Sequence, residues 1–258
     1  MLDAARAAVR AAATLLRGAT AADIRAKGTP RDLVTEWDLR SEDCIREVLA
    51  PTGIAVLGEE GGETGATGQG QGGARWLVDP IDGTVNFSHG LPIWSISIAL
   101  ETAAGIELGI VYAPELGWWF EAEAGKGARD DAGRAYRVSA IARLESAILS
   151  TGFPYDLATS PDNNFAEWDH LQRVAGACRR LGCASLDLCL VAAGRLDGYW
   201  ERKLKPWDVA AGALIVREAG GTVTNTRGGA FDPHSGEAVA TNGAIHEELV
   251  AELTRVRP

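Results

Sequence analysis

Apolar side chains recur at helical spacing in two segments near the N-terminus. In the first segment they share one helical face: Leu2, Ala5, Val9, Ala12 and Leu16. This repeat is typical of an amphipathic helix, so we predict a helix over residues 2–16. A similar spacing predicts a second helix over residues 33–49, with Asp38 in its early turns.

Short apolar segments follow and predict strands. Residues 55–57 and 76–78 are uniformly apolar, whereas residues 94–100 alternate between apolar and small or polar side chains. Residues 106–112 and 118–122 are separated by a Pro and Gly turn, which predicts a hairpin. The first half is therefore expected to hold two helices followed by an antiparallel sheet.

The pattern changes after about residue 141, where strands and helices alternate. The predicted helices cover residues 164–178, 184–193, 207–219 and 244–256. The predicted strands cover residues 146–151 and 197–201 and the surroundings of Val223 and Val239. Such interleaving indicates sheets covered by helices. We expect an N-terminal domain over residues 1–141 and a C-terminal domain over residues 142–258, with the site between them.

Residues 61–73 form a glycine-rich segment, with seven glycines in 13 positions. This composition favours a flexible surface loop, and it is also compatible with a mobile flap beside Glu59. No Gly-Lys-Ser/Thr closes the segment, so it does not match a nucleotide-binding P-loop.

The chain is acidic, with 35 Asp and Glu against 25 Lys and Arg and a net charge of −10. Such a surface repels nucleic acid and anionic membranes, so we expect neither as a partner. Residues 83–100 lack charge but contain Pro92 and several polar residues, which argues against a membrane span. The N-terminal segment has no apolar core typical of a secretory signal, and we expect a cytoplasmic protein.

The four cysteines form no CxxC pair, and the chain has only four histidines. Both features disfavour a zinc cluster, and reduced, buried thiols are expected instead. Acidic residues are better candidates for metal ligands because they stand at the ends of predicted elements: Glu59, Glu60, Asp79, Asp82 and Asp208. Carboxylate oxygens select Mg²⁺ over softer metals.

Asp79 and Asp82 are three positions apart, with the rigid Pro80 between them. Two carboxylates held in this way can share a cation cluster that activates water at a phosphate ester. Gly83 and Thr84 follow directly, and backbone amides at such a helix start can bind phosphate oxygens. Taken alone, Asp208 is more typical of a helix cap, and a lone Glu-Glu pair such as Glu59–Glu60 is more typical of solvated surface.

These motifs have a known counterpart. Residues 79–84 (Asp-Pro-Ile-Asp-Gly-Thr) and 207–212 (Trp-Asp-Val-Ala-Ala-Gly) resemble the two signatures of the inositol monophosphatase family. The Gly-Glu-Glu of residues 58–60 matches its third acidic motif, and Lys27 with residues 32–38 resembles its N-terminal motif. The resemblance covers nearly the whole chain.

The resemblance implies roles for individual residues. The implied Mg²⁺ ligands are Glu59, Asp79 and the Ile81 carbonyl for a first ion, Asp79, Asp82 and Asp208 for a second, and Glu59 with Glu60 for a weaker third. The implied groups around the attacking water and the phosphate are Glu59, Thr84, Asp38, Lys27 and the amides of Gly83 and Thr84. The implied contacts of the polyol hydroxyls are Asp82, Ala184, Glu201 and Asp208.

The resemblance also implies a layered αβαβα sandwich of the inositol monophosphatase and fructose-1,6-bisphosphatase type, a homodimer and inhibition by Li⁺. The implied reaction is hydrolysis of a small phosphate ester, inositol-1-phosphate first, by in-line attack of water. Alternatives of the same fold are fructose-1,6-bisphosphatase, histidinol-phosphatase, 3′-phosphoadenosine-5′-phosphate phosphatase and a regulatory binding protein. Lys203, Lys205 and the Arg179–Arg180 pair either meet a second phosphate or are solvated or in subunit contacts.

Overall fold

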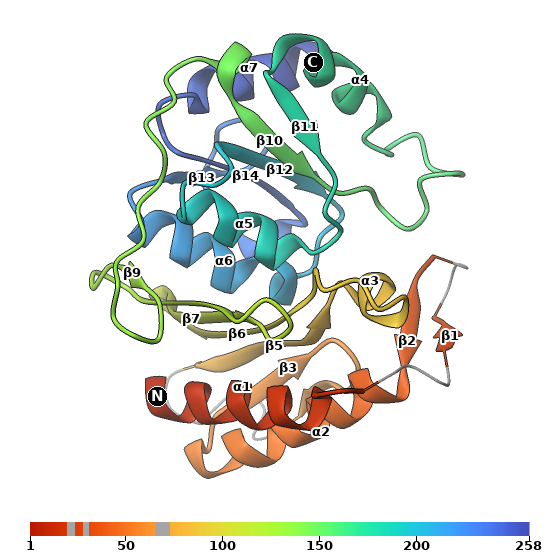
Figure 1. Ribbon diagram of the computed structural model, residues 1–258, viewed down its shortest axis with the longest axis vertical. Helices are drawn as coiled ribbons and strands as arrows, with labels where there is room; N and C mark the ends of the chain where they lie inside the picture. The colour runs from red at the N-terminus through yellow and green to blue at the C-terminus, as the bar shows by residue number, and fades with distance from the viewer. Residues whose placement is uncertain (20–23, 28–30, 65–72, 258) are drawn as a thin grey trace.

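The computed structural model of the chain describes residues 1–19, 24–27, 31–64 and 73–257. Helices and sheets alternate in five layers, which form the expected αβαβα sandwich (Figure 1). The two N-terminal helices cover the outer face of one sheet, two helices lie between the sheets, and two cover the outer face of the other sheet. In this order they are α1 (Leu2–Leu16), α2 (Glu36–Leu49), α5 (Ala184–Ala192), α6 (Pro206–Glu218), α4 (Phe165–Val174) and α7 (His246–Val256).

The first sheet has seven strands in the order β4-β3-β5-β6-β7-β8-β9. They are β3 (Ala55–Gly58), β4 (Gly62–Thr64), β5 (Arg75–Asp82), β6 (Ser95–Thr102), β7 (Gly105–Ala113), β8 (Trp118–Glu123) and β9 (Ala128–Arg129). Among the strands in the described part of this sheet only β3 and β5 pair in parallel, so both carry their carboxyl ends to the same edge. The pairing of β5 with β6 shifts between Asp79 and Asp82, and the short helix α3 (Thr84–Ser88) follows.

The second sheet has five strands in the order β11-β10-β12-β14-β13. They are β10 (Ile148–Thr151), β11 (Ala177–Arg179), β12 (Gly198–Arg202), β13 (Thr222–Thr224) and β14 (Glu237–Thr241). Strand β10 pairs in parallel with both β11 and β12. A two-stranded antiparallel pair, β1 (Ile24–Ala26) with β2 (Leu33–Thr35), lies apart from both sheets.

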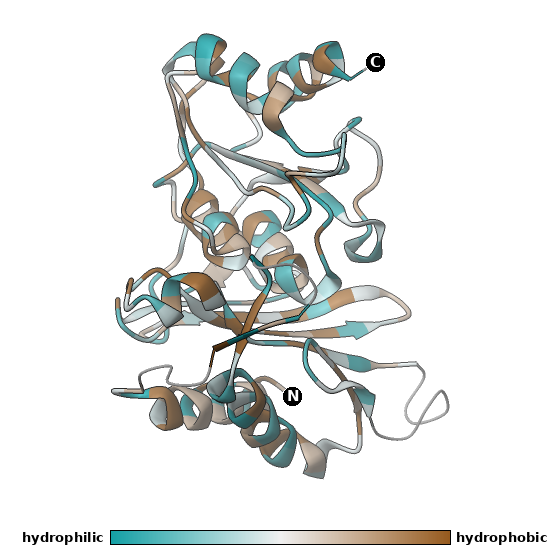
Figure 2. Ribbon diagram, turned by 90° about the vertical axis from the view of Figure 1, so that its right-hand side faces the viewer, coloured by the Kyte–Doolittle hydropathy of each residue, from teal (hydrophilic) through white to brown (hydrophobic). Residues whose placement is uncertain are grey.

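The central layer explains why its helices are apolar on nearly every side. Residues 209–216 of α6 are all buried, because sheets cover the helix on both faces. The helix also packs closely on β7, since a Cβ on Gly109 would lie 2.8 Å from Ala211 Cα. The outermost helices instead carry both hydrophilic and hydrophobic residues, as expected where one face meets solvent (Figure 2).

Two predicted helices were too long. Residues 33–35 form β2, and the second helix begins at Glu36, because Thr35 caps it: Thr35 Oγ1 accepts from the Trp37 amide, and Asp38 accepts from the Thr35 amide. The helix predicted over 164–178 ends at Val174, because residues 177–179 pair with β10 instead. Within the glycine-rich segment residues 62–64 form β4, and residues 65–72, on which the loop and flap predictions fall, lie outside the described residues.

The structure also bears on the expectations about membrane-spanning helices and about the cysteines. None of the helices in the described ranges is both long and apolar enough to cross a bilayer. All four cysteines are free thiols, and Cys178, Cys183 and Cys189 are buried, whereas Cys44 is partly exposed.

Candidate active site

A cavity of about 500 Å³ lies where the acidic ends of the elements meet. Its acidic lining residues include Glu59, Asp79, Asp82, Glu201 and Asp208, and the predicted residues Lys27, Ile81, Gly83, Thr84 and Ala184 also line it. Two predicted site residues, Asp38 and Glu60, are not part of the lining. The fold therefore brings most of the predicted residues together from segments that are up to 181 positions apart, the separation of Lys27 from Asp208.

Asp79 lies at the end of β5 and is only 2% exposed. Its Oδ1 accepts the Ile81 amide at 3.0 Å, which turns the chain at Pro80. Burial raises the pKa of Asp79 well above its ordinary value, and the neighbouring charges of Glu59, Asp82 and Asp208 raise it further. A cation beside Asp79 would therefore stabilise the ionised form of this buried carboxylate.

Asp82 faces the N-terminus of α5. Its Oδ2 accepts the Ser185 amide at 2.7 Å and the Ser185 hydroxyl at 2.6 Å, and its Oδ1 accepts the Ala184 amide at 3.3 Å. The Cys183 thiol donates to Oδ2 at 3.3 Å. Burial raises the pKa of Asp82, while these hydrogen bonds oppose the rise and hold the carboxylate in one orientation.

Gly83 and Thr84 join this acidic strand end to α3. Gly83 has φ +93°, and a Cβ there would lie 3.1 Å from the Ile93 carbonyl oxygen, so glycine suits the position on both grounds. Thr84 Oγ1 lies 3.0 Å from Asp38 Oδ1 and 3.1 Å from the Ile81 carbonyl oxygen. Asp38 is fully buried below the cavity and acts on it through Thr84.

Glu59 and Glu60 follow β3, and both form ion pairs with the ammonium group of Lys27. Lys27 Nζ lies 2.8 Å from Glu59 Oε1 and 2.5 Å from Glu60 Oε1. Burial raises the pKa of Glu59 to about 7 even though Lys27 lowers it. The pKa of Lys27 is also raised, because the two carboxylates outweigh the opposite effect of its burial. Glu59 thus combines a partner cation with a pKa suited to accepting a proton.

Asp208 caps a helix and also lines the cavity. Its Oδ2 accepts the Lys205 amide at 2.7 Å and so caps α6, and the residue also lines the cavity. Burial raises the pKa of Asp208 well above its ordinary value, with further contributions from the charges of Asp82 and Glu59.

One part of the cavity is built around Glu201. Tyr199 donates its hydroxyl to Glu201 Oε2 at 2.7 Å, and a Cβ on Gly152 would collide with the carboxylate. Burial raises the pKa of Glu201 to about 7, and the Tyr199 hydrogen bond opposes the rise. Arg180 lines the same cavity.

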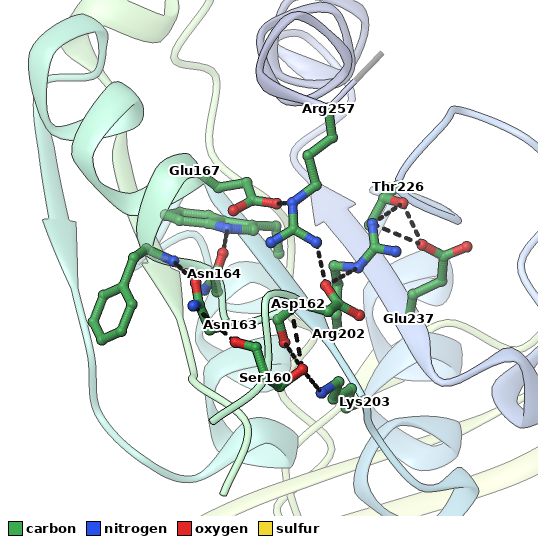
Figure 3. Close-up of polar contacts among 12 residues, drawn as sticks. Ser160, Asp162, Asn163, Asn164, Glu167, Arg202, Lys203, Thr226, Glu237 and Arg257 are labelled. Carbon is green, nitrogen blue, oxygen red and sulfur yellow. Dashed lines mark hydrogen bonds and ion pairs between the residues drawn. The ribbon is translucent and has the colours of Figure 1, made fainter. Parts of the chain in front are cut away.

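Residues 152–156 form one wall of the cavity, and side chains outside the cavity hold the neighbouring segments in place. Asn164, buried with φ +67°, donates to Thr151 Oγ1 at 2.8 Å and accepts the Trp200 indole N–H at 2.8 Å. Figure 3 shows Arg257 reaching both Glu167 and Asp162, and Lys203 reaching Ser160. The C-terminal end of the chain thereby fixes the segment that leads into α4.

Lys203 also forms an ion pair with Asp156, at 2.8 Å, so its ammonium already has carboxylate and hydroxyl partners. Lys205 and Arg180 line the cavity, whereas Arg179 donates to the Cys178 carbonyl. Several residues around the site carry no signal in the sequence. Ser41, Glu42 and Ser185 bind partners that are distant in the chain, Tyr155 lines the cavity, and Tyr199 binds Glu201 two positions away without a motif that marks the contact.

The donor set fits a hard divalent cation in its chemistry. Among the described residues no three His, Cys, Asp or Glu side chains are already gathered as a closed ligand set. The lining nevertheless offers oxygen donors from Glu59, Asp79, Asp82 and Asp208, and the pKa values of Asp79 and Asp208 are raised by burial and further by the charges of the other members. Mutually repelling, buried carboxylates are the groups that a Mg²⁺ ion would stabilise.

Comparison with known proteins gives consistent results. A family model described as the inositol monophosphatase family matches residues 1–257. Inositol-1-monophosphatase of Caulobacter vibrioides is 38% identical over 257 residues, which are 98% of this chain and 99% of that protein. Nus factor SuhB of Pseudomonas aeruginosa is 41% identical over 233 residues, which are 88% of this chain and 84% of that protein. The structure of inositol monophosphatase from Anabaena (Nostoc) sp. PCC 7120 has a TM-score of 0.89 and 38% identity, covering 100% of this chain and 96% of that one.

Proposed function

The chain belongs to the inositol monophosphatase family, and we propose that it hydrolyses a small polyol phosphate monoester, inositol-1-phosphate, to the polyol and phosphate. The observation that carries this proposal is the single cavity lined by Glu59, Asp79, Asp82 and Asp208 beside Gly83 and Thr84. Acidic oxygen donors next to a glycine-led helix start suit a metal-assisted reaction at phosphate.

We propose Mg²⁺ as the cofactor, with two to three ions per site. The residues that would hold it are Glu59, Glu60, Asp79, Asp82, Asp208 and the carbonyl of Ile81. Bound Mg²⁺ supplies the positive charge that polarises the ester and activates water. The chain's own groups orient the reactants: Thr84 donates to Asp38, which leaves a lone pair of its hydroxyl oxygen to accept from the attacking water.

We assign to Glu59 the acceptance of a proton from that water, because its carboxylate lines the cavity and is held in place by Lys27. The amides of Gly83 and Thr84 would bind the phosphate, and Asp82, Ala184, Glu201 and Asp208 would contact the polyol hydroxyls. A carboxylate at Glu201, together with a Lys203 already paired to Asp156, favours a hydroxyl-rich substrate over one with a second phosphate.

A substrate panel tests the function. Purified protein with Mg²⁺ should show its highest kcat/KM on inositol-1-phosphate, with fructose-1,6-bisphosphate, histidinol phosphate and 3′-phosphoadenosine-5′-phosphate turned over less efficiently. Chelation with EDTA should abolish turnover. A clear preference for a bisphosphate, or undiminished turnover in EDTA, would contradict the proposal.

A regulatory role is a second candidate, because relatives about 40% identical are named Nus factor SuhB. Complementation of a deletion strain by an inactive Asp79→Asn variant would favour that role.

We further propose a homodimer, and two domains over residues 1–141 and 142–258. The seven-stranded sheet, which ends at Arg129, and the five-stranded sheet, which begins at Ile148, support the division.

A further inference from the structure

Helix α2 presents a row of buried polar side chains to the acidic edge of the first sheet. Asp38, Ser41 and Glu42 are each at most 2% exposed and share one helical face. Asp38 accepts from Thr84, and Ser41 donates to the Pro80 carbonyl at 3.2 Å. The third member, Glu42, has no role in the function proposed above and does not line the cavity.

Glu42 binds the turn that follows β3. Its Oε2 accepts the Glu60 amide at 2.8 Å, and its Oε1 accepts the Gly61 amide at 2.8 Å. One carboxylate thereby satisfies two successive backbone donors directly after Glu59. Hydrogen bonds to an ionised acceptor are among the stronger ones in proteins.

Arg46 supports Glu42 from the next turn of the helix. Its Nε donates to Glu42 Oε1 at 2.9 Å, while its guanidinium also reaches the carbonyls of Val56 at 3.1 Å and Gly62 at 2.6 Å. The pair therefore binds strand β3, the turn and strand β4 to one helix.

The glycines around the turn leave room for this carboxylate. A Cβ on Gly58 would lie 2.5 Å from Glu42 Cδ, and a Cβ on Gly61 would lie 2.7 Å from Oε1. Neither glycine needs a left-handed backbone at these positions, so the close approach of Glu42 explains both. The Gly-Glu-Glu-Gly sequence is thus shaped by a residue 16 positions before it.

We propose that Glu42 is a positioning residue for the metal-dependent hydrolysis: it fixes the turn from which Glu59 enters the cavity. The inference rests on the proposed function, and Glu42 acts through the turn without touching substrate or metal. Glu42→Gln keeps the volume but removes the charge and one of the two acceptor oxygens. Glu47→Gln, an exposed carboxylate on the same helix, is the matched control.

Three measurements on wild type and both variants test the proposal. In metal-free protein, hydrogen exchange of the Glu60 and Gly61 amides should be about tenfold faster in Glu42→Gln. Calorimetric titration should show Mg²⁺ affinity weakened by about tenfold, and kcat at fixed Mg²⁺ should fall by about the same factor. The KM for inositol-1-phosphate should stay near wild type, and excess Mg²⁺ should restore part of kcat. Glu47→Gln should match wild type throughout.

The outcomes separate a positioning role from a structural one. If Glu42→Gln lowers only the melting temperature in EDTA, while amide exchange at the turn and Mg²⁺ affinity match wild type, the proposal is overturned. If wild type itself binds no Mg²⁺ and hydrolyses no monoester, the proposed function fails. The exchange measurement still decides then whether Glu42 holds the turn, because it needs neither metal nor substrate.

Discussion

Thr84 Oγ1 donates to Asp38 Oδ1 at 3.0 Å, across 46 positions of sequence. Asp38 is itself fixed by the amide and hydroxyl of Thr35, at 2.7 and 2.6 Å. The cap of α2 therefore orients the hydroxyl of a residue that lines the acidic cavity.

This relationship predicts the behaviour of Thr84 variants. Thr84→Ala removes the oxygen that would orient water and should lower kcat by about 10²-fold. Thr84→Ser keeps the hydroxyl and should retain activity within about tenfold. Ser88→Ala on the same short helix is the control and should leave steady-state kinetics unchanged. Equal losses in Thr84→Ala and Thr84→Ser would show that the methyl packing, and not the hydroxyl, matters.

Glu59→Gln tests the proton acceptor. The amide keeps the shape but removes the charge that pairs with Lys27 and the capacity to accept a proton. We expect kcat to fall by about 10²–10⁴-fold with a smaller change in KM. Glu63→Gln, on the exposed strand β4, should behave as wild type. Retention of kcat within about threefold would place Glu59 outside the reaction.

Charge repulsion in the cleft predicts a link between metal and stability. Ions that bind only the folded protein stabilise it by about 2.7 kcal/mol at a hundredfold excess over Kd. For a chain of this size, the melting temperature should then rise by about 5 °C in Mg²⁺ relative to EDTA. Absence of any shift at millimolar Mg²⁺ would contradict the cation site.

The two aspartates of the Asp79–Asp82 motif should differ when metal is absent. Asp79 has one backbone donor and four carboxylate neighbours, so Asp79→Asn should raise the melting temperature in EDTA by relieving repulsion. Asp82 accepts bonds from Ser185 that favour its charge, so Asp82→Asn should bring no such gain. Both variants should lose activity. Differential scanning fluorimetry with and without Mg²⁺ measures the melting temperatures of both variants. Equal melting temperatures of Asp79→Asn and Asp82→Asn in EDTA would refute the predicted difference.

Tyr199 should set the acid limb of the pH profile. Glu201 has a pKa of about 7 and is protonated below it, and the Tyr199 hydroxyl favours the ionised form. Tyr199→Phe should therefore raise this pKa and move the acid limb of kcat/KM to higher pH by about one unit. Tyr136→Phe removes a different hydroxyl donor, to the Trp119 carbonyl, and should leave the profile in place. Superimposed profiles for Tyr199→Phe and wild type would exclude this role.

Glu121 predicts a stability effect remote from the cavity. Its fully buried carboxylate accepts from Arg6 Nε at 2.8 Å, Arg129 Nε at 2.9 Å and the Trp119 indole at 3.0 Å, which ties α1 to β8 and β9. Glu121→Gln removes the buried charge that Arg6 and Arg129 share and leaves them only their longer ion pairs with Asp3 and Glu123. It should cost about 3 kcal/mol in the free energy of unfolding. Glu123→Gln, two positions along the strand and partly exposed, should cost under about 1 kcal/mol. Denaturant titration of both variants measures the difference.

Most elements of this chain were predictable because their signals are local. The apolar face from Leu2 to Leu16 and the alternation after Trp94 correspond to α1 and β6. The start of α2 at Glu36 was also encoded locally, in the reciprocal Thr35 and Asp38 cap, although the apolar spacing alone suggested an earlier start. The end of α4 at Val174 was not encoded locally, because residues 177–179 form a strand only through their pairing with β10.

The sequence by itself determined the chemistry of the site: acidic motifs at the ends of strands and helices, a glycine-led helix start and an all-oxygen donor set. Short-range spacing carries this information, since Asp79, Asp82 and Thr84 lie within six consecutive residues. Only the tertiary structure decided how Glu42 holds the turn after Glu59, how the α5 N-terminus orients Asp82 and how Tyr199 contacts Glu201. The first two contacts join residues that are far apart in the chain, and Tyr199 lies beside Glu201 on β12 without a spacing that marks a hydrogen bond. Each depends on how buried polar groups find partners as the layers pack, and no local pattern records that pairing.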